Sequence, residues 1–210
     1  MSFIIEIVNK YILQNLSKGV VNINGRSFFS KYSKLINLLY FITKFIPNSL
    51  FLILLNMLDG FENKTVLLLR YFYVKKNSLK CGGNVFIGKY VTLKNIHGLE
   101  LGENVSIQAY CYLDAYGGIK IGNDVSVANH TSLISFEHTW ENNDIPIKYN
   151  KIKTGEIVIE NDVWIGNGCR ILADVKIQRR SIVAAGAVVN KNIEGNMIVG
   201  GVPARKIKEI

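Results

Sequence analysis

The sequence predicts an all-β fold, a parallel β-helix preceded by a helical N-terminal extension. Branched aliphatic residues recur every six positions near the C-terminus, at Ile159, Ile165, Ile171, Ile177, Val183 and Val189. A smaller side chain follows four places later in each hexad, at Val163, Cys169, Val175, Ser181 and Ala187. A period of six fits neither a helix nor a two-sided strand. It is typical of a β-helix, in which each unit stacks its aliphatic residue on the unit below.

The repeats begin after Cys81. Their earlier aliphatic positions are Ile87, Leu93, Leu101, Ile107, Leu113, Ile121, Val127 and Leu133. Two-residue insertions fall at 95–98 and 117–118, and we expect them at turns, where insertions cost little. The next jump, from Leu133 to Ile159, is 26 residues, or one hexad plus twenty, which predicts an excursion at 137–156. We therefore assign 81–194 to the β-helix and 195–210 to a C-terminal tail.

The turns are predicted from glycine, asparagine and aspartate. A glycine directly follows several aliphatic positions, as in Ile165-Gly166, and a polar pair such as Asn123-Asp124 follows at the same place. These residue types tolerate the left-handed backbone that tight turns need. We therefore expect both the glycines and the polar pairs to supply left-handed turn residues.

Residues 1–80 are predicted to be helical, hydrophobic and basic. Apolar residues at helical spacing predict a helix over 3–16, and the apolar runs at 35–46 and 49–58 predict two short helices that meet at Pro47. A further helix is expected at 64–77. Eleven Lys or Arg and three acids lie in residues 1–80, so this part holds +8 of the formal net charge of +9.

Three interpretations of residues 1–80 remain open. Basic residues that flank apolar runs favour peripheral contact with an anionic membrane surface over binding to nucleic acid. A helical cap packed on the β-helix, or on a neighbouring subunit, is the alternative. A transmembrane span is the third, but Lys44 and Pro47 interrupt the apolar stretch of about 20 residues that a span needs.

The cysteines and the N-terminus predict a cytoplasmic location, at the inner face of the membrane if residues 1–80 contact it. Three widely spaced cysteines do not suit a disulfide framework or a four-cysteine zinc site. The first residues lack a basic region before the apolar run and a cleavage motif, so we expect them to belong to the mature protein. Cys111 and Cys169 share the phase of Val163 and Val175, which predicts small core residues rather than nucleophiles.

The segment at 163–210, which contains VWIGNGCRILADVKI, VAAGAVVNKNI and VGGVPARKIKEI, resembles the end of the sugar O-acetyltransferases related to maltose and galactoside acetyltransferase. These are hexapeptide-repeat acyltransferases, and the resemblance covers about residues 82–210. It implies a left-handed parallel β-helix and a homotrimer with active sites between subunits. It also implies acetyl transfer from acetyl-CoA to a hydroxyl of a saccharide. The apolar, basic N-terminal region suggests that this saccharide is a unit of a surface polysaccharide built at the membrane.

His138 is the candidate general base. It lies where the regular repeats break off, and the resemblance places it at the position of the catalytic histidine. Histidine can take a proton from the acceptor hydroxyl near neutral pH, so that the acetyl group passes directly to the acceptor. His97 and His130 are 41 and 8 residues from it. This spacing argues against a three-histidine metal site of the γ-carbonic-anhydrase kind, and we expect no metal.

The resemblance also implies the donor site. Trp164 and Gly166 are expected at the thioester end, and the backbone of Ala185 at the pantetheine arm. The remaining donor contacts are expected from Asn190 and Lys191 at the outer groove and from Arg205 and Lys208 at the phosphates.

The acceptor contacts are less defined. Gln108 stands where relatives have an asparagine, which leaves the oxyanion or acceptor contact open among Gln108, Tyr110, Asp114 and Asn129, and Trp140 offers an aromatic surface for a sugar. The alternative activities are those of a serine O-acetyltransferase or an amino-sugar N-acetyltransferase. A non-catalytic β-helix scaffold is the alternative from another class.

Overall fold

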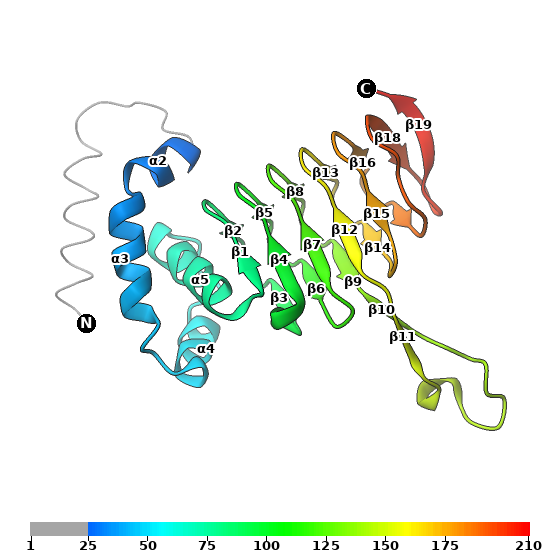
Figure 1. The fold of residues 1–210 in the computed structure, drawn as a ribbon, viewed down its shortest axis with the longest axis horizontal. Helices are drawn as coiled ribbons and strands as arrows, with labels where there is room; N and C mark the ends of the chain where they lie inside the picture. Colours follow the sequence, from blue (N-terminus) through cyan, green and yellow to red (C-terminus); the bar gives the residue numbers. More distant parts are fainter. Residues whose placement is uncertain (1–24) are drawn as a thin grey trace. The chain divides into compact units, whose positions relative to one another are not determined.

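The computed structural model describes residues 25–210 (Figure 1). The helix predicted at 3–16 lies outside the described residues. The chain divides into two compact units, Met1–Ser33 and Lys34–Ile210. The described part of the first unit contains the short helix α2 (Gly25–Lys31).

The second unit is a β-solenoid preceded by helices, as predicted (Figure 1). Three parallel sheets form its sides. The first sheet contains β1 (Lys80–Cys81), β4 (Leu99–Leu101), β7 (Ile119–Ile121), β12 (Ile157–Ile159) and β15 (Lys176–Ile177). The second contains β2 (Phe86–Ile87), β5 (Ser106–Ile107), β8 (Ser126–Val127), β13 (Trp164–Ile165), β16 (Ile182–Val183), β18 (Met197–Gly200) and the antiparallel β19 (Arg205–Glu209). The third contains β3 (Thr92–Lys94), β6 (Tyr112–Asp114), β9 (Ser132–Ile134), β14 (Arg170–Ile171) and β17 (Val188–Val189).

The aliphatic residues of the six-residue period pair with one another between turns and form the core. Ile159 pairs with Ile177 in the first sheet, and Ile165 pairs with Val183 in the second. These four side chains are at most 1% exposed. The smaller residues four places later are buried as well, so both inward positions of each hexad are confirmed.

The turns correct one part of the prediction. The second members of polar pairs, such as Asp124 (φ 58°) and Asp162 (φ 58°), are left-handed, as expected. Gly166, by contrast, is not left-handed. A Cβ at Gly166 would lie 2.6 Å from the backbone nitrogen of Ala185 on the next turn. This glycine is needed because two turns approach closely, and not because of its φ angle.

Two groups of turns are used below. The second corner denotes the turns that follow the strands of the second sheet, at 88–91, 108–111, 128–131, 166–169 and 184–187. The third corner denotes those that follow the third sheet, at 95–98, 115–118, 172–175 and 190–192, together with Ser135. The two-residue insertions lie at the third corner: the short 3-10 helix η1 (Ile96–Gly98) follows left-handed Asn95, and Gly118 has φ 95°.

A hairpin leaves the solenoid between β9 and β12, in the region of the predicted excursion. Its strands β10 (Phe136–His138) and β11 (Ile152–Thr154) pair antiparallel, with His138 opposite Ile152. The loop between them contains the 3-10 helix η2 (Ile147–Tyr149). In Figure 1 the hairpin projects away from the regular turns.

Three helices precede the solenoid in the second unit: α3 (Ser33–Thr43), α4 (Asn48–Met57) and α5 (Lys64–Asn77). The two short helices on either side of Pro47 and the helix at 64–77 are thus confirmed. Within the described residues, no single helix has the length and apolar composition of a membrane span. The pair α3 and α4 has them together, but its axes differ by 116°.

Helix α5 covers the first turn of the solenoid. Its Phe72 and Val74 are buried, and the Tyr71 hydroxyl donates to the Gly82 carbonyl at 3.1 Å. The buried Arg70 guanidinium donates to the Asp59 carbonyl at 2.6 Å and to the Asp59 carboxylate at 3.2 Å. The same carboxylate oxygen accepts the backbone N–H of Tyr90 at 3.0 Å. These contacts tie the α4–α5 loop to the first turn.

Candidate active site

His138 ends strand β10 and its side chain is exposed. Its ring contacts Phe136 edge to face, with 6.5 Å between centroids, and Phe136 contacts Tyr116 in the same way at 5.8 Å. The imidazole is therefore supported on one side by aromatic rings and remains accessible on the hairpin.

Ser135 fixes the root of the hairpin. This residue is fully buried, and its hydroxyl donates to the Asp114 carbonyl at 2.7 Å and accepts the Gly117 N–H at 2.9 Å. The N–H of Gly155, where the chain returns, donates to the Ser135 carbonyl at 3.0 Å. The hydroxyl thus joins the start of the hairpin to the turn before it, and the carbonyl joins the two ends of the hairpin to each other.

Asp114, an expected acceptor contact, has structural partners. Its side chain is 7% exposed and accepts the Asn95 amide at 2.7 Å. The Tyr112 hydroxyl donates to the other carboxylate oxygen at 3.5 Å. Burial, followed by the nearby Asp114 carboxylate, raises the pKa of Tyr112. Asp114 therefore holds the third corner beneath the hairpin.

The hairpin loop is ordered by Asn150, whose side chain is buried. Its carbonyl oxygen accepts the Asn142 N–H at 3.0 Å, and its amide donates to the Asn142 carbonyl at 3.1 Å. At the base of the loop, Thr139 bonds the Lys151 carbonyl through both its N–H (3.0 Å) and its hydroxyl (2.8 Å). Trp140, next to Thr139, is 69% exposed and is available to a ligand or to another chain.

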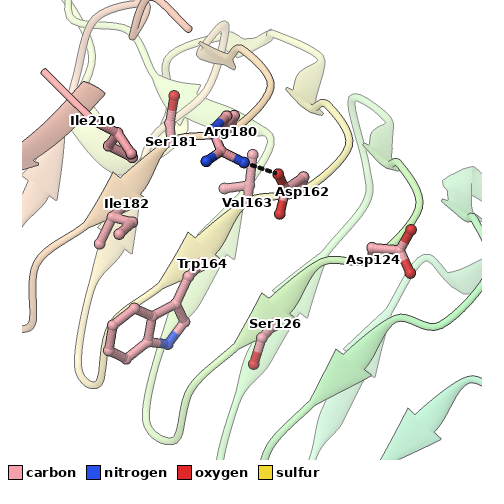
Figure 2. A pocket seen from close by; sticks show the side chains of 9 residues that line it. All are labelled: Asp124, Ser126, Asp162, Val163, Trp164, Arg180, Ser181, Ile182 and Ile210. Atoms are coloured by element: carbon pink, nitrogen blue, oxygen red, sulfur yellow. Dashed lines mark hydrogen bonds and ion pairs between the residues drawn. The ribbon is translucent and has the colours of Figure 1, made fainter. Parts of the chain in front are cut away.

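Trp164 borders a shallow pocket on the outer face of the second sheet (Figure 2). Ser126 and Ile182 are its register partners on the turns before and after. Arg180 pairs with Asp162 at 3.4 Å on another side of the pocket. These four pocket residues were not predicted from the sequence. The hexad register could have identified Ser126 and Ile182, because it aligns both with Trp164.

Gly166 and Ala185 lie at the second corner but differ in what they can offer a ligand. Gly166 is buried, its N–H donates to the Val183 carbonyl at 2.8 Å, and its carbonyl accepts the Thr131 hydroxyl at 3.1 Å. Ala185 is exposed, and its peptide groups take part in none of the backbone hydrogen bonds between the described turns. Ala185 can therefore bind a ligand through its backbone, whereas Gly166 can provide only van der Waals contact.

Three rings stack along the second corner. The Tyr110 ring lies 5.0 Å from Tyr90 on the preceding turn and 4.8 Å from His130 on the following turn. Both faces of Tyr110 are thus occupied by protein, so this residue can offer an acceptor only its edge and hydroxyl. Gln108 is half-buried beside it, and the Asn129 carbonyl accepts the Gly168 N–H at 2.9 Å.

The expected cations of the donor site lie at the C-terminal end. Arg205 and Lys208 are exposed on β19, where Lys208 is opposite Ile198 of β18. Asn190 and Lys191 are exposed just after β17, at the third corner of the last turns. The two groups are therefore on different sides of the solenoid end.

Within one chain, the expected site residues form two groups. His138, Trp140 and Asp114 belong to the third corner and its hairpin. The second group lies on the second sheet and second corner: Trp164, Gly166, Ala185, Gln108, Tyr110 and Asn129. The strands of the third sheet separate these corners, so a single chain does not place the imidazole beside Trp164.

The cysteines are not arranged as nucleophiles. Cys111 and Cys169 are buried, and each Sγ lies 3.1 Å from a carbonyl oxygen on the next turn, of Ala128 and Ala184 respectively. Burial raises the pKa of both thiols. Among the residues that the structure describes, no three His, Cys, Asp or Glu side chains are grouped so that they could hold a metal ion.

Comparison with known proteins shows which families and proteins this chain is similar to. Residues 156–191 match the model of the bacterial transferase hexapeptide, six repeats. The solenoid is built from hexapeptide repeats. Galactoside O-acetyltransferase of Escherichia coli K12 is 40% identical over 70 residues, which is 31% of this chain and 34% of that protein. The chain spans about a quarter to a third of the length of the first such relatives.

Solved structures show the same fold. A maltose O-acetyltransferase from Clostridium difficile 630 is 24% identical, with a TM-score of 0.67, over 74% of this chain and 82% of that one. A hexapeptide-repeat acetyltransferase from Vibrio cholerae, solved with acetyl coenzyme A, is also 24% identical, with a TM-score of 0.66 and the same coverage. The chain therefore resembles hexapeptide-repeat acetyltransferases, including the maltose and galactoside O-acetyltransferases.

Proposed function

We propose that this protein transfers an acetyl group from acetyl-CoA to a hydroxyl of a saccharide. The observation that carries the proposal is the exposed imidazole of His138, on the hairpin that interrupts an otherwise regular solenoid. The buried Ser135 hydroxyl and the Asn150 amide order the hairpin before and after His138, so the backbone that carries the imidazole is fixed. The acetyltransferases to which the chain is similar support the reaction class.

In this mechanism a ring nitrogen of His138 accepts the proton of the acceptor hydroxyl as the oxygen attacks the thioester carbonyl. A C–O bond forms and the C–S bond then breaks. The coenzyme A sulfur leaves with the electron pair and takes the proton from the imidazolium. The oxyanion formed in between needs a hydrogen-bond donor. The Gln108 amide, the Asn129 amide and the Tyr110 hydroxyl are the candidates, because each can donate, whereas the Asp114 carboxylate accepts a hydrogen bond from Asn95.

The donor would lie along the second sheet toward the C-terminus. The ring of Trp164 is 54% exposed and can pack against the thioester end. The free peptide of Ala185 can bond the amides of the pantetheine arm. Arg205 and Lys208 supply cations for the phosphates, for which charge-assisted hydrogen bonds are well suited. Asn190 and Lys191 lie at the third corner, so we assign them to the outer border of the groove on a neighbouring subunit.

The active site is proposed to form between subunits of a homotrimer. His138 and Trp164 lie on different sides of one chain, so a complete site needs the hairpin of one subunit beside the second sheet of its neighbour. Light scattering should give a mass of three chains. A mixture of inactive His138→Ala and Trp164→Ala chains, refolded together, should regain activity. Recovery would fail if each chain held a complete site.

The acceptor is proposed to be a unit of a surface polysaccharide, acetylated at the cytoplasmic face of the membrane. The alternatives are an amine of an amino sugar and the hydroxyl of serine, because the same base could deprotonate either nucleophile. A panel of neutral sugars, amino sugars and serine, offered with acetyl-CoA while free thiol is followed, distinguishes these acceptors. If no acceptor in the panel gives thiol release, the result would favour the non-catalytic scaffold.

His138→Ala is the decisive variant in this assay. The loss of a general base lowers kcat by about 10²–10⁴-fold. His97→Ala is the matched control, because His97 is also an exposed histidine but lies in η1 after β3, two strands of the third sheet before the hairpin. Equal activity of the two variants would contradict the assignment of the base.

A further inference from the structure

Helices α3 and α4 present large apolar side chains to the outside. The α3–α4 surface is defined by the exposed residues Leu35, Leu38, Phe41, Ile42, Phe45, Leu50, Leu52, Ile53 and Met57. Phe45 and Met57 are each 76% exposed. Exposed apolar areas of this extent on a folded chain mark interaction sites.

Both faces of α4 are apolar. Phe51 and Leu55 point inward and are buried, and Phe51 meets Tyr73 of α5 edge to face at 5.6 Å. Leu50, Ile53 and Met57 follow one another at helical spacing on the outer face. A helix packed on one side only normally has a polar outer face, whereas one that is apolar all round is covered on every side. Something other than α5 therefore covers the outer face of α4.

Cations border the α3–α4 surface. Lys44, at the bend between the helices, lies 5.2 Å from the centre of the Tyr40 ring, and Lys75 of α5 lies at the same distance from that ring. Lys76 donates to the Ile46 carbonyl at 2.6 Å. No acidic residue occurs between Lys34 and Leu58. Tyrosine and lysine next to an apolar surface form the side-chain combination that is enriched where proteins meet lipid headgroups.

The backbone at the bend is largely paired within the chain. The N–H groups of Lys44, Phe45 and Ile46 bond the carbonyls of Phe41, Ile42 and Thr43 at 3.1–3.3 Å. The Thr43 hydroxyl donates to the Tyr40 carbonyl at 2.7 Å. Such pairing lowers the cost of placing this segment where water is scarce.

We propose that the α3–α4 surface lies in one leaflet of an anionic lipid bilayer, with Tyr40, Lys44, Lys75 and Lys76 at the headgroups. The 116° bend suits a segment that enters and remains in one leaflet rather than one that crosses. The basic border and the absence of acids favour anionic lipid over a second copy of this surface, which would bring like charges together. This inference does not rest on the proposed reaction, although it would place the solenoid near membrane-bound saccharides.

Flotation with vesicles tests the proposal without any acetyl donor. The full chain is mixed with vesicles of phosphatidylcholine and phosphatidylglycerol (3:1), or of phosphatidylcholine alone. We expect it to float with the anionic vesicles and at least fivefold less with the neutral ones. Leu38→Asp with Ile53→Asp should lower flotation at least tenfold, since each side chain would lose its burial in lipid. Leu79→Asp with Ile147→Asp is the matched control, because these residues are 67% and 63% exposed but lie outside the surface.

A second variant keeps the test decisive if the aspartate pair does not fold. Lys44→Gln alters no apolar contact and should lower flotation with anionic vesicles about fivefold, because one lysine near such a surface contributes about 1 kcal/mol. The proposal is overturned if the full chain stays in solution, or if both variants float like the parent. It is also overturned if light scattering shows that the aspartate pair changes the oligomer mass, because the surface would then join copies of the chain. Loss of acetyl transfer with flotation intact would bear only on the proposed reaction.

Discussion

The solenoid and helices α3 and α4 are both rich in branched and aromatic apolar residues, but they place them in opposite ways. Ile165, Ile177 and Val183 are 0% exposed, whereas Phe45 and Met57 are 76% exposed. The six-residue period brings each aliphatic residue of the solenoid to the inside, where the next turn covers it. Among residues 25–210, the outer sides of α3 and α4 have no such neighbour. Apolar content alone therefore does not determine which side chains are buried. In the solenoid, the six-residue period determines it.

The largest difference is expected between matched isoleucines in the two regions. Ile165→Ala should lower the free energy of unfolding by about 2–5 kcal/mol, because it removes buried methylenes and leaves a cavity. Ile53→Ala removes the same atoms from a side chain that is 57% exposed. It should change the free energy of unfolding by less than about 0.5 kcal/mol. Denaturant titrations of both variants measure the difference. Equal losses would show that α4 is covered within the protein itself.

Two glycines of the same turn sharpen the account of close packing. Gly166→Ala should destabilise the fold by about 3 kcal/mol, because the new Cβ would press on the Ala185 backbone. Gly168 has φ 71° and open space at its Cβ position, so Gly168→Ala should cost only about 1 kcal/mol of backbone strain. The midpoints of chemical unfolding give both values. If Gly166→Ala destabilises the fold less than Gly168→Ala does, the contact between turns is not what requires a glycine at position 166.

A smaller loss of stability is expected from a substitution at the root of the hairpin. Ser135→Ala removes the buried hydroxyl that bonds Asp114 and Gly117, and leaves the part-buried N–H of Gly117 without its acceptor. The expected loss is about 1–3 kcal/mol of stability. Ser106→Ala is the control, since that hydroxyl bonds Ser126 on a half-buried face at 3.1 Å. Proteolysis within 139–151 should become faster in the Ser135 variant only.

The smallest effect concerns the thiols. Burial raises the pKa of Cys81 to about 12, although Lys75 lowers it slightly, so little thiolate forms at pH 8. Alkylation of the folded chain by iodoacetamide should therefore be at least tenfold slower than that of the unfolded chain. The unfolded thiol loses its proton at lower pH than the folded one. This group should therefore make the fold less stable as the pH rises from about 9 towards 12. A fast reaction at pH 8 would contradict the burial.

The fold was largely predictable from the sequence because one regular period determines it. Every aliphatic position from Ile159 to Val189 is buried as predicted, and the helices on either side of Pro47 were predicted from two apolar runs and a proline. The role of Gly166 could not be predicted, because the distance to Ala185 depends on how two turns stack.

The candidate site was less predictable. Sequence position indicated His138 and Trp164 separately, but which edge of the solenoid carries each depends on the corner at which the hairpin leaves. The occupied faces of Tyr110 depend on Tyr90 and His130, each 20 residues away. Arg180 and Asp162 form an ion pair across neighbouring turns, and the polar pair that ends at Asp162 predicted a turn there but not this ion pair.

The strand order of the second sheet also defines a scale of length. From the strand that carries Trp164, the order runs β13, β16, β18 and β19, and β19 carries Arg205. Neighbouring strands are about 4.8 Å apart, so three steps separate Trp164 from the cations by about 14 Å. A ligand that touches both must therefore span three strand spacings. Adding or removing one turn would alter this reach by a fixed increment, which no change of side chain on the existing turns could reproduce.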